Sequence, residues 1–233
     1  MAWKTAGILG GMGPEATVDL MDRIIRATPA EDDADHVRLI VDQNPQVPSR
    51  LKALFEGTGE SPAPCLAGMA VKLEEWGADF LAIPCNTAHY YYDDVKAAVS
   101  IPVLNIIGIT VDAVAGSLSG DGAAGLLAST AVIKTGLYDK AFSKKALKLV
   151  TPSDEIQERL LDAICAIKRG DKGDAVQSAV CAAAHDLVEQ GAGALVVACT
   201  ELSVVASCLA DDVPVFDSAQ LLAERIVKEA KGA

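Results

Sequence analysis

Residues 77–87 read GADFLAIPCNT, and a similar run, GAGALVVACTE, occurs 114 residues later at residues 191–201. The likeness continues outside these runs, at Leu73 and Leu187, at residues 7–9 and 125–127, and at residues 102–103 and 214–215. The pairing covers most of both halves. We therefore interpret the chain as two copies of one unit.

Both halves alternate short apolar runs with helical patterns, which is typical of parallel sheets covered by helices. The expected strands are residues 5–9, 37–42, 80–84 and 103–105 in the first half and 123–128, 146–150, 194–198 and 213–216 in the second. The sequence thus predicts an α/β fold of two pseudo-symmetric domains, each a mostly parallel four-stranded sheet flanked by helices. The active site is expected in the cleft between them. The first domain would comprise residues 1–105 plus 216–233, and the second residues 106–215.

Two helices have clear signals. One opens with Pro14, where a missing N–H costs nothing, and its pattern predicts that Val18, Met21, Ile24 and Ile25 are buried on one face. The other follows Ser153, carries apolar residues at 156, 160, 164 and 167, and should end at Gly170.

Composition excludes several classes of partner. The 233 residues carry a net charge of −12 and a pI near 4.6, so long-range repulsion opposes nucleic acid and anionic membranes. The first residues lead directly into a strand pattern without a signal sequence, so we expect a soluble, cytoplasmic protein. The six cysteines lack CxxC or Cys/His spacing, which predicts reduced thiols and no metal site.

Cys85 and Cys199 each stand just after a buried strand, where α/β folds usually bind ligands. One such cysteine alone is as well explained by core packing. A matched pair favours function, because two thiols on opposite sides of a ligand can take a proton from one face of a carbon and return it to the other. That is the chemistry of a racemase or epimerase without a cofactor.

Other candidate groups have two interpretations. Gly11-x-Gly13-x-x-Ala16 fits a loose dinucleotide fingerprint, but it also fits a tight strand-to-helix turn whose N–H groups hold a small anion. Arg50 can clamp a carboxylate or lie on the surface. His89 can polarise the Cys85 loop or be an ordinary helix residue. Glu201 can hold a substrate ammonium or orient the thiol.

These residues resemble the aspartate racemase branch of the aspartate/glutamate racemase family. The resemblance covers nearly the whole chain, and its most specific motifs are PCNTAH at residues 84–89 and ACTEL at residues 198–202. It implies two similar α/β domains with the active site between them, a homodimer, and racemisation of an acidic amino acid without pyridoxal phosphate or another cofactor. Aspartate would be the first substrate to test and glutamate the second.

The resemblance also assigns roles. Cys85 and Cys199 fall on the two acid/base cysteines, with Cys85 acting on the D-enantiomer and Cys199 on the L-enantiomer. Arg50 and Lys168 fall on positions that bind the substrate carboxylates. The remaining candidate substrate contacts are Met12, Asn44, Asn86, Thr87, Thr130, Thr200 and Glu201.

The sequence departs from the family at residues 129–132. These residues read Ser-Thr-Ala-Val where the family usually has Thr-x-Gly-Thr, so a hydroxyl expected near residue 132 is absent. Glutamate racemases differ more, with Asp-Ser-Gly at the N-terminal loop and His in place of Glu201. Three alternatives stay open: a maleate-type cysteine isomerase, a two-lobed protein that binds a small anion, and a dehydrogenase.

Overall fold

The computed structural model describes residues 3–56, 58–118, 122–209 and 213–232. The chain divides into two compact units, unit 1 within residues 1–106 and 219–233, and unit 2 within residues 107–218. The domain limits expected from the sequence stay a prediction, and their residues 1–2, 57, 119–121, 210–212 and 233 lie outside the described part.

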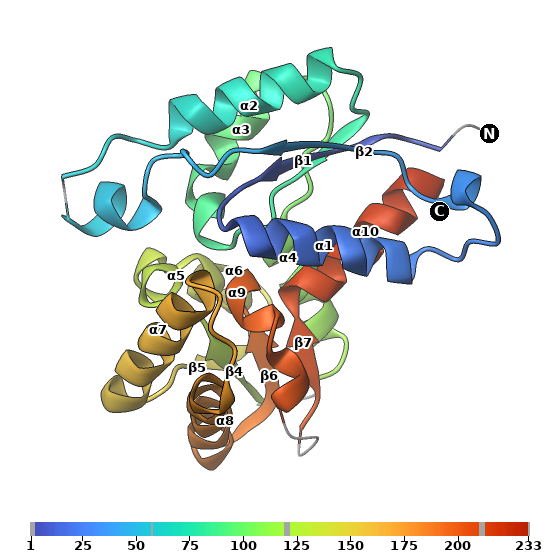
Figure 1. The fold of residues 1–233 in the computed structure, drawn as a ribbon. Helices are drawn as coiled ribbons and strands as arrows, with labels where there is room; N and C mark the ends of the chain where they lie inside the picture. The colour runs from blue at the N-terminus through green and yellow to red at the C-terminus, as the bar shows by residue number, and fades with distance from the viewer. Residues whose placement is uncertain (1–2, 57, 119–121, 210–212, 233) are drawn as a thin grey trace. The chain divides into compact units, whose positions relative to one another are not determined.

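Unit 1 is built on a parallel three-stranded sheet in the order β2-β1-β3. Its strands are β1 (Ala6–Gly10), β2 (Leu39–Gln43) and β3 (Phe80–Ala82). Helix α1 (Pro14–Ala27) and the C-terminal helix α10 (Ser218–Lys231) lie on one face, and α2 (Ala63–Glu75) and α3 (Tyr92–Ala98) lie on the other (Figure 1). Shorter helical segments are η1 (Asp33–Asp35), η2 (Lys52–Glu56) and η3 (Thr87–Tyr91).

The prediction of a fourth strand at residues 103–105 is wrong. Val103 forms only an isolated parallel bridge with Leu81, through two backbone hydrogen bonds of 2.8 Å. Pro102 has no N–H to extend the ladder, and α4 (Ile106–Ala115) begins three residues after Val103. There is no room for a longer strand, so the sheet of unit 1 has three strands instead of four. This sheet is called sheet 1 below, and the sheet of unit 2 is called sheet 2.

Helix α1 begins at Pro14 as expected, but part of its predicted buried face is wrong. The helix buries Ala16, Leu20 and Ile24, which are spaced four residues apart and share one side. Val18 and Ile25 are 57% and 53% exposed. The helix carries more apolar surface than one side can hold, and only the side along Ala16 and Ile24 is covered.

Unit 2 is built on a parallel four-stranded sheet in the order β5-β4-β6-β7. Its strands are β4 (Ala123–Leu127), β5 (Lys148–Val150), β6 (Ala192–Val197) and β7 (Val215–Asp217). Its helical segments are α5 (Thr130–Thr135), α6 (Leu137–Ser143), α7 (Asp154–Lys168), α8 (Asp174–Glu189), α9 (Thr200–Ser203) and η4 (Ala206–Cys208), besides most of α4. The predicted helix after Ser153 is confirmed as α7, and Gly170 follows its end with a φ of +88°.

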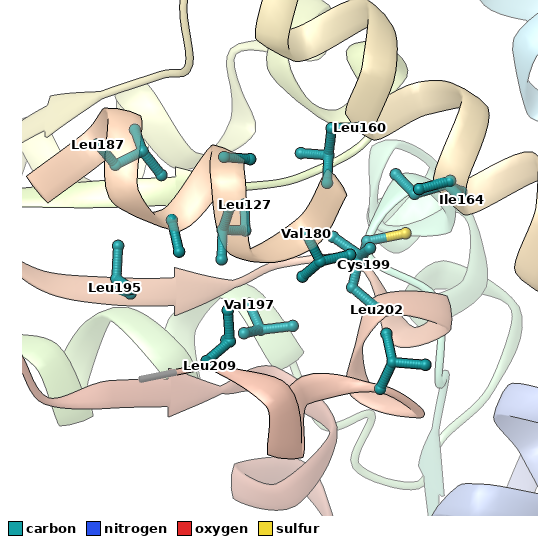
Figure 2. Close-up of a cluster of buried hydrophobic side chains, with 14 of the residues drawn as sticks. Leu127, Leu160, Ile164, Val180, Leu187, Leu195, Val197, Cys199, Leu202 and Leu209 are labelled. Atoms are coloured by element: carbon teal, nitrogen blue, oxygen red, sulfur yellow. The ribbon is translucent and has the colours of Figure 1, made fainter. Parts of the chain in front are cut away.

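A cluster of buried side chains joins α7, α8 and the sheet of unit 2 (Figure 2). Leu160 and Ile164 from α7 and Val180 and Leu187 from α8 pack against the sheet, which contributes among others Leu195. Cys199 belongs to the same cluster, at the end of the chain segment that leaves β6. The apolar core of unit 2 therefore fixes the backbone on which this thiol is carried.

The internal repeat is present in the packing as well as in the sequence. A Cβ added at Gly7 would lie 2.9 Å from Ala78 Cβ and 3.3 Å from Leu73 Cβ. One added at Gly125 would lie 3.1 Å from Ala192 Cβ and 2.8 Å from Leu187 Cβ, which are the matching residues of the second half. In both units the strand order begins second, first, third along the sheet. Each unit thus repeats one βαβ arrangement in which a glycine of the first strand admits a helix.

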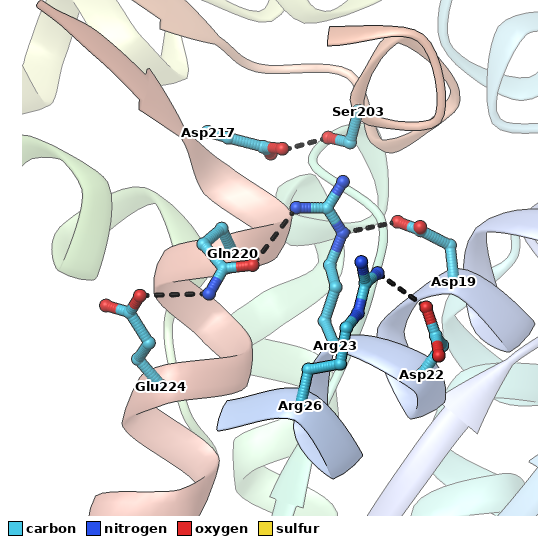
Figure 3. A network of polar contacts seen from close by, with 8 residues as sticks. All are labelled: Asp19, Asp22, Arg23, Arg26, Ser203, Asp217, Gln220 and Glu224. Atoms are coloured by element: carbon cyan, nitrogen blue, oxygen red, sulfur yellow. Dashed lines mark hydrogen bonds and ion pairs between the residues drawn. The ribbon is translucent and has the colours of Figure 1, made fainter. Parts of the chain in front are cut away.

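Within each unit, hydrogen bonds connect residues that lie close to the C-terminal helix α10 (Figure 3). In unit 1, Arg23 of α1 donates to Asp19 at 2.6 Å and to Gln220 of α10 at 3.2 Å, and the Arg23 side chain is only 13% exposed. In unit 2, Ser203 donates to Asp217 at 2.6 Å. Among the described residues, no helix is long and apolar enough to cross a membrane.

Candidate functional site

Cys85 lies three residues beyond the end of β3, in a buried loop at the carboxyl edge of sheet 1. Only 6% of the residue is exposed, and it belongs to one apolar cluster with Met12, Val47 and Tyr91. Met12 comes from the loop after β1, and Val47 from the loop after β2. Residues from the loops after all three strands of sheet 1 therefore belong to the apolar cluster that contains this thiol.

His89 is fixed by buried hydrogen bonds on both ring nitrogens. Its Nδ1 lies 2.9 Å from the carbonyl oxygen of Cys85, and its Nε2 accepts from the backbone N–H of Ile106 at 3.1 Å. Burial lowers the pKa of His89 to about 4, although the nearby carbonyls of Cys85 and Leu104 offset part of this effect. His89 is therefore neutral at physiological pH. The sequence left open whether His89 polarises the Cys85 loop or is an ordinary helix residue. It lies in η3 and contacts the Cys85 carbonyl, but a single histidine has no pattern from which to predict the contact with Ile106.

Cys199 is also 6% exposed and directly precedes the short helix α9. Its Sγ donates a hydrogen bond to Glu201 Oε2 at 3.2 Å. Burial and then the Glu201 carboxylate raise the pKa of Cys199 well above the ordinary thiol value. Cys199 is accordingly a protonated thiol in this arrangement, and Glu201 orients it.

Lys168 stands at the last position of α7 and brings a positive charge to the same place. Its Nζ lies 3.4 Å from Glu201 Oε1, at the long end of the range for an ion pair. Oε1 itself accepts no hydrogen bond from any described residue, so its interaction with Lys168 Nζ is a charge attraction. Lys168 also lowers the pKa of Cys199, but less than burial and Glu201 raise it. The structure therefore brings three predicted site residues of unit 2 together: Cys199, Glu201 and Lys168.

Thr130 is the first residue of α5, at the carboxyl edge of sheet 2. Gln157 of α7 donates to the carbonyl of Ala128 at 3.0 Å and lies 3.4 Å from Thr130 Oγ1. Sequence reasoning did not find Gln157, because helical spacing distinguishes only apolar from polar positions. At the unusual residue 132, the Val132 side chain is buried, and its N–H bonds to the Ser129 hydroxyl that caps α5.

The predicted residues on the β2 loop mainly contact that loop and its surroundings. Arg50 Nη1 donates to the carbonyls of Val47 and Pro48 at 3.3 and 3.2 Å. The Asn44 side-chain oxygen accepts from the Gln46 N–H at 3.0 Å, and its amide nitrogen lies 3.6 Å from Cys65 Sγ. These bonds give the loop a defined shape and place the Arg50 guanidinium close to its own backbone.

The polar residues next to the two cysteines are largely buried. Asn86 is 2% and Thr200 1% exposed, and Thr87 is partly buried at the start of η3. Short polar side chains at such depth are unusual unless they are hydrogen-bonded. The two loops therefore share a buried cysteine followed by a buried polar residue.

The remaining cysteines are free thiols. Cys181 Sγ lies 3.4 Å from Cys208 Sγ, and burial, then Cys181, raises the pKa of Cys208 to about 12. Within the described ranges, no group of three or more His, Cys, Asp or Glu residues is arranged to hold a metal ion.

Comparison with known proteins places this arrangement in a family. Residues 9–226 match the family model described as Asp/Glu/Hydantoin racemase. The broad specificity amino-acid racemase RacX of Bacillus subtilis is 28% identical over 234 residues, covering 95% of this chain and 96% of the relative.

Solved structures agree on the fold. The aspartate racemase of Picrophilus torridus is 30% identical in sequence and superposes with a TM-score of 0.86. The match covers 98% of this chain and 94% of the Picrophilus chain. Glutamate racemase isoform RacE1 of Bacillus anthracis is 22% identical and gives a TM-score of 0.66, and the match covers 98% of this chain and 83% of the RacE1 chain. At this identity it supports the fold alone. Together with the two cysteine loops, the match over most of the length shows that the chain belongs to the Asp/Glu/hydantoin racemase family.

Proposed function

We propose that the protein is an amino-acid racemase that interconverts L- and D-aspartate, with glutamate as a second candidate, using two cysteines and no cofactor. The observation that carries the proposal is the matched pair Cys85 and Cys199, each buried just beyond the third strand of its unit. Membership of a racemase family and the names of the relatives support it.

The proposed reaction moves one proton to each side of the α-carbon. One cysteine, as thiolate, takes the α-proton on its Sγ, and the other, as thiol, gives its proton to the opposite face. The first cysteine ends as thiol and the second as thiolate, so protons and charge balance. This scheme requires the two units to hold one substrate between Cys85 and Cys199.

The protonation of Cys199 suggests which half-reaction the free protein is prepared for. Cys199 is a thiol bonded to Glu201, so it can serve as the acid, and Cys85 would then be the base. By the family resemblance, Cys85 acts on the D-enantiomer, so this state would convert the D- to the L-form. For the reverse direction the Cys199 proton must leave, and Glu201 Oε2, which accepts its hydrogen bond at 3.2 Å, would receive it.

The difficult step is the formation of a carbanion beside a carboxylate. Cations placed at the carboxylate oxygens stabilise the charge that develops there. We propose Arg50 and Lys168 for this role, since an arginine fork matches two oxygens at once and the Lys168 side chain is half exposed. Asn86, Thr87, Thr130 and Thr200 would add polar contacts, and Met12 and Asn44 would line the site from unit 1.

Replacing each thiol in turn tests the two-base scheme. Cys85→Ser and Cys199→Ser should each lower kcat for racemisation at least about a hundredfold, because a serine hydroxyl is far too weak an acid and base for this proton transfer. Loss of optical activity of enantiopure aspartate, without added pyridoxal phosphate or metal, is the measurement. Near-normal turnover by either folded variant would refute the scheme.

A different measurement separates each of the three alternatives. A maleate-type isomerase would change the ultraviolet absorbance of maleate and leave enantiopure amino acids unchanged. A small-anion binding protein would bind aspartate in calorimetry without turning it over. A dehydrogenase would require tight binding of NAD.

Two further expectations belong to this proposal. The resemblance favours a homodimer, and the exposed Val18 and Ile25 of α1 are apolar surface that such an interface would cover. The scheme also needs Cys85 and Cys199 as free thiols, which fits a reducing compartment such as the cytoplasm.

A further inference from the structure

We propose that His89 is a positioning residue for the Cys85 thiol, because its neutral imidazole hydrogen-bonds both to the Cys85 carbonyl and to the first N–H of α4. We call this pair of hydrogen bonds the clasp. This inference rests on the proposed function of Cys85, but the clasp itself is a structural claim that can be tested without turnover.

The hydrogen bonds define which nitrogen carries the proton. The N–H of Ile106 points at Nε2 at 3.1 Å, so Nε2 must present its lone pair. The Cys85 carbonyl faces Nδ1 at 2.9 Å and can only accept, so Nδ1 must carry the hydrogen. Only the neutral Nδ1–H tautomer satisfies both contacts. A second proton on Nε2 would point at the Ile106 N–H.

The ring has little freedom to turn. His89 is 4% exposed, and the Tyr92 ring stacks on it at 5.9 Å between centroids and an interplanar angle of 11°. Tyr92 is held in turn, because its hydroxyl donates to the Val103 carbonyl at 2.8 Å. Val103 forms the bridge to Leu81 of β3. The imidazole is thus connected through Tyr92 to the strand that leads into Cys85.

The two ends of the clasp have different consequences: the contact with Ile106 holds the start of α4, and the contact with Cys85 positions the thiol loop. Ile106 is the first residue of α4, and the first N–H groups of a helix have no partner within it. The chain passes from unit 1 to unit 2 directly after this residue. His89 therefore joins the thiol loop to the point where the chain leaves unit 1. A shift of the Cys85 carbonyl would move its Sγ, and misplacing a catalytic group by about 1 Å costs on the order of a hundredfold in rate.

Two amide variants divide the clasp into its halves. In His89→Asn, the side-chain nitrogen stands near the position of Nδ1, so it can still donate to the Cys85 carbonyl but cannot reach Ile106. In His89→Gln, the amide reaches the position of Nε2, so it can accept from Ile106 but no longer holds Cys85. The pair is matched in chemistry and differs in which contact survives.

The positioning role predicts a ranking of kcat. His89→Asn should stay within about fivefold of the unchanged protein, and His89→Gln should lose about tenfold to a hundredfold, with KM changed by less than about threefold in both. Rates are compared at a temperature where circular dichroism shows both variants folded. If His89 served only to cap α4, the ranking would be reversed, because His89→Gln keeps the Ile106 contact.

Nitrogen NMR of the labelled imidazole tests the clasp independently of activity. We expect the signals of a neutral Nδ1–H ring at pH 7. An Nε2–H ring, or a cationic one, would overturn the inference whatever the kinetics. If the unchanged protein racemises no amino acid, the proposed function fails and the tautomer alone decides about the clasp. If it does racemise and His89→Gln is the better variant, only the inference fails.

Discussion

The Cys199 thiol donates a hydrogen bond to Glu201 Oε2, and Lys168 Nζ lies 3.4 Å from the other oxygen of the same carboxylate. A negative charge therefore stands next to a thiol that must become negative during half of the proposed cycle. Like charges at this range disfavour each other, so the carboxylate keeps the thiol protonated. The lysine offsets part of that effect.

Removing the charge of Glu201 should move the pKa of Cys199 in one direction, and removing the charge of Lys168 should move it in the other. Glu201→Gln removes the carboxylate that raises this pKa, so the pKa should fall and the thiolate should form at lower pH. Lys168→Met removes the cation that lowers it, so the pKa should rise. The measurement is the ultraviolet absorbance of the thiolate against pH, with Cys199→Ser in each background as the blank. Equal midpoints in both variants would contradict the assignment.

At this scale, the sequence identified residues that belong to a pattern. Cys85 and Cys199 were found because one cysteine repeats the other, Glu201 because it lies in the Cys199 loop, and Lys168 because it matches a family position. The hydrogen bonds of His89 and Gln157 depend on atoms brought together by the fold, over separations of 17 and 29 residues. Neither contact has a counterpart in the repeat. Only the tertiary structure reveals them.

Among the elements, the repeated contact of Gly7 and Gly125 gives a test of packing. A methyl group at Gly7 would lie 2.6 Å from Leu81 Cδ2, and one at Gly125 would lie 2.8 Å from Leu187 Cβ. Gly7→Ala and Gly125→Ala should each lower the free energy of unfolding by about 1–3 kcal/mol. For a chain of this length, that is a fall in Tm of about 2–4 °C per kcal/mol.

Gly68 supplies the matched control. It lies in α2, and a methyl group added there would have no heavy atom within 4 Å. Gly68→Ala should keep or raise the Tm, because alanine is favoured in helices by up to about 1 kcal/mol. Thermal melts of the three variants decide the matter. If Gly7→Ala or Gly125→Ala melted like Gly68→Ala, the packing of helix against strand would be wrong.

Periodicity predicted the strands and helices well but could not predict how far each one extends or which side is covered. The run at residues 103–105 looks like a strand, yet Pro102 and the start of α4 leave it one bridge. Val18 and Ile25 look like core, yet the side of α1 that faces the sheet is set by Ala16, Leu20 and Ile24. Ala16 is small and adds little to a hydrophobic pattern, so the pattern does not mark the side of α1 on which it lies.

For the whole molecule, the central expectation is that both cysteines of one site come from one chain. Co-expression of Cys85→Ser and Cys199→Ser chains then gives dimers whose every site lacks one thiol. We expect such mixtures to stay as inactive as either variant alone, as measured by the loss of optical activity. Recovery of activity in the purified mixed dimer would mean that sites are shared between subunits.

The repeat made the presence of two similar α/β units predictable from the sequence. Both sheets are parallel and begin in the same strand order. The repeat predicts each unit by itself, and no pattern in one half of the chain specifies how a substrate would be held.

The most direct test of the account is racemisation of L-aspartate in deuterium oxide, followed by NMR of the α-position during the first few per cent of conversion. Two thiols acting on opposite faces predict that the D-aspartate formed carries deuterium at the α-carbon, while the remaining L-aspartate still carries protium. D-aspartate that appears with its original α-proton would contradict the two-thiol account.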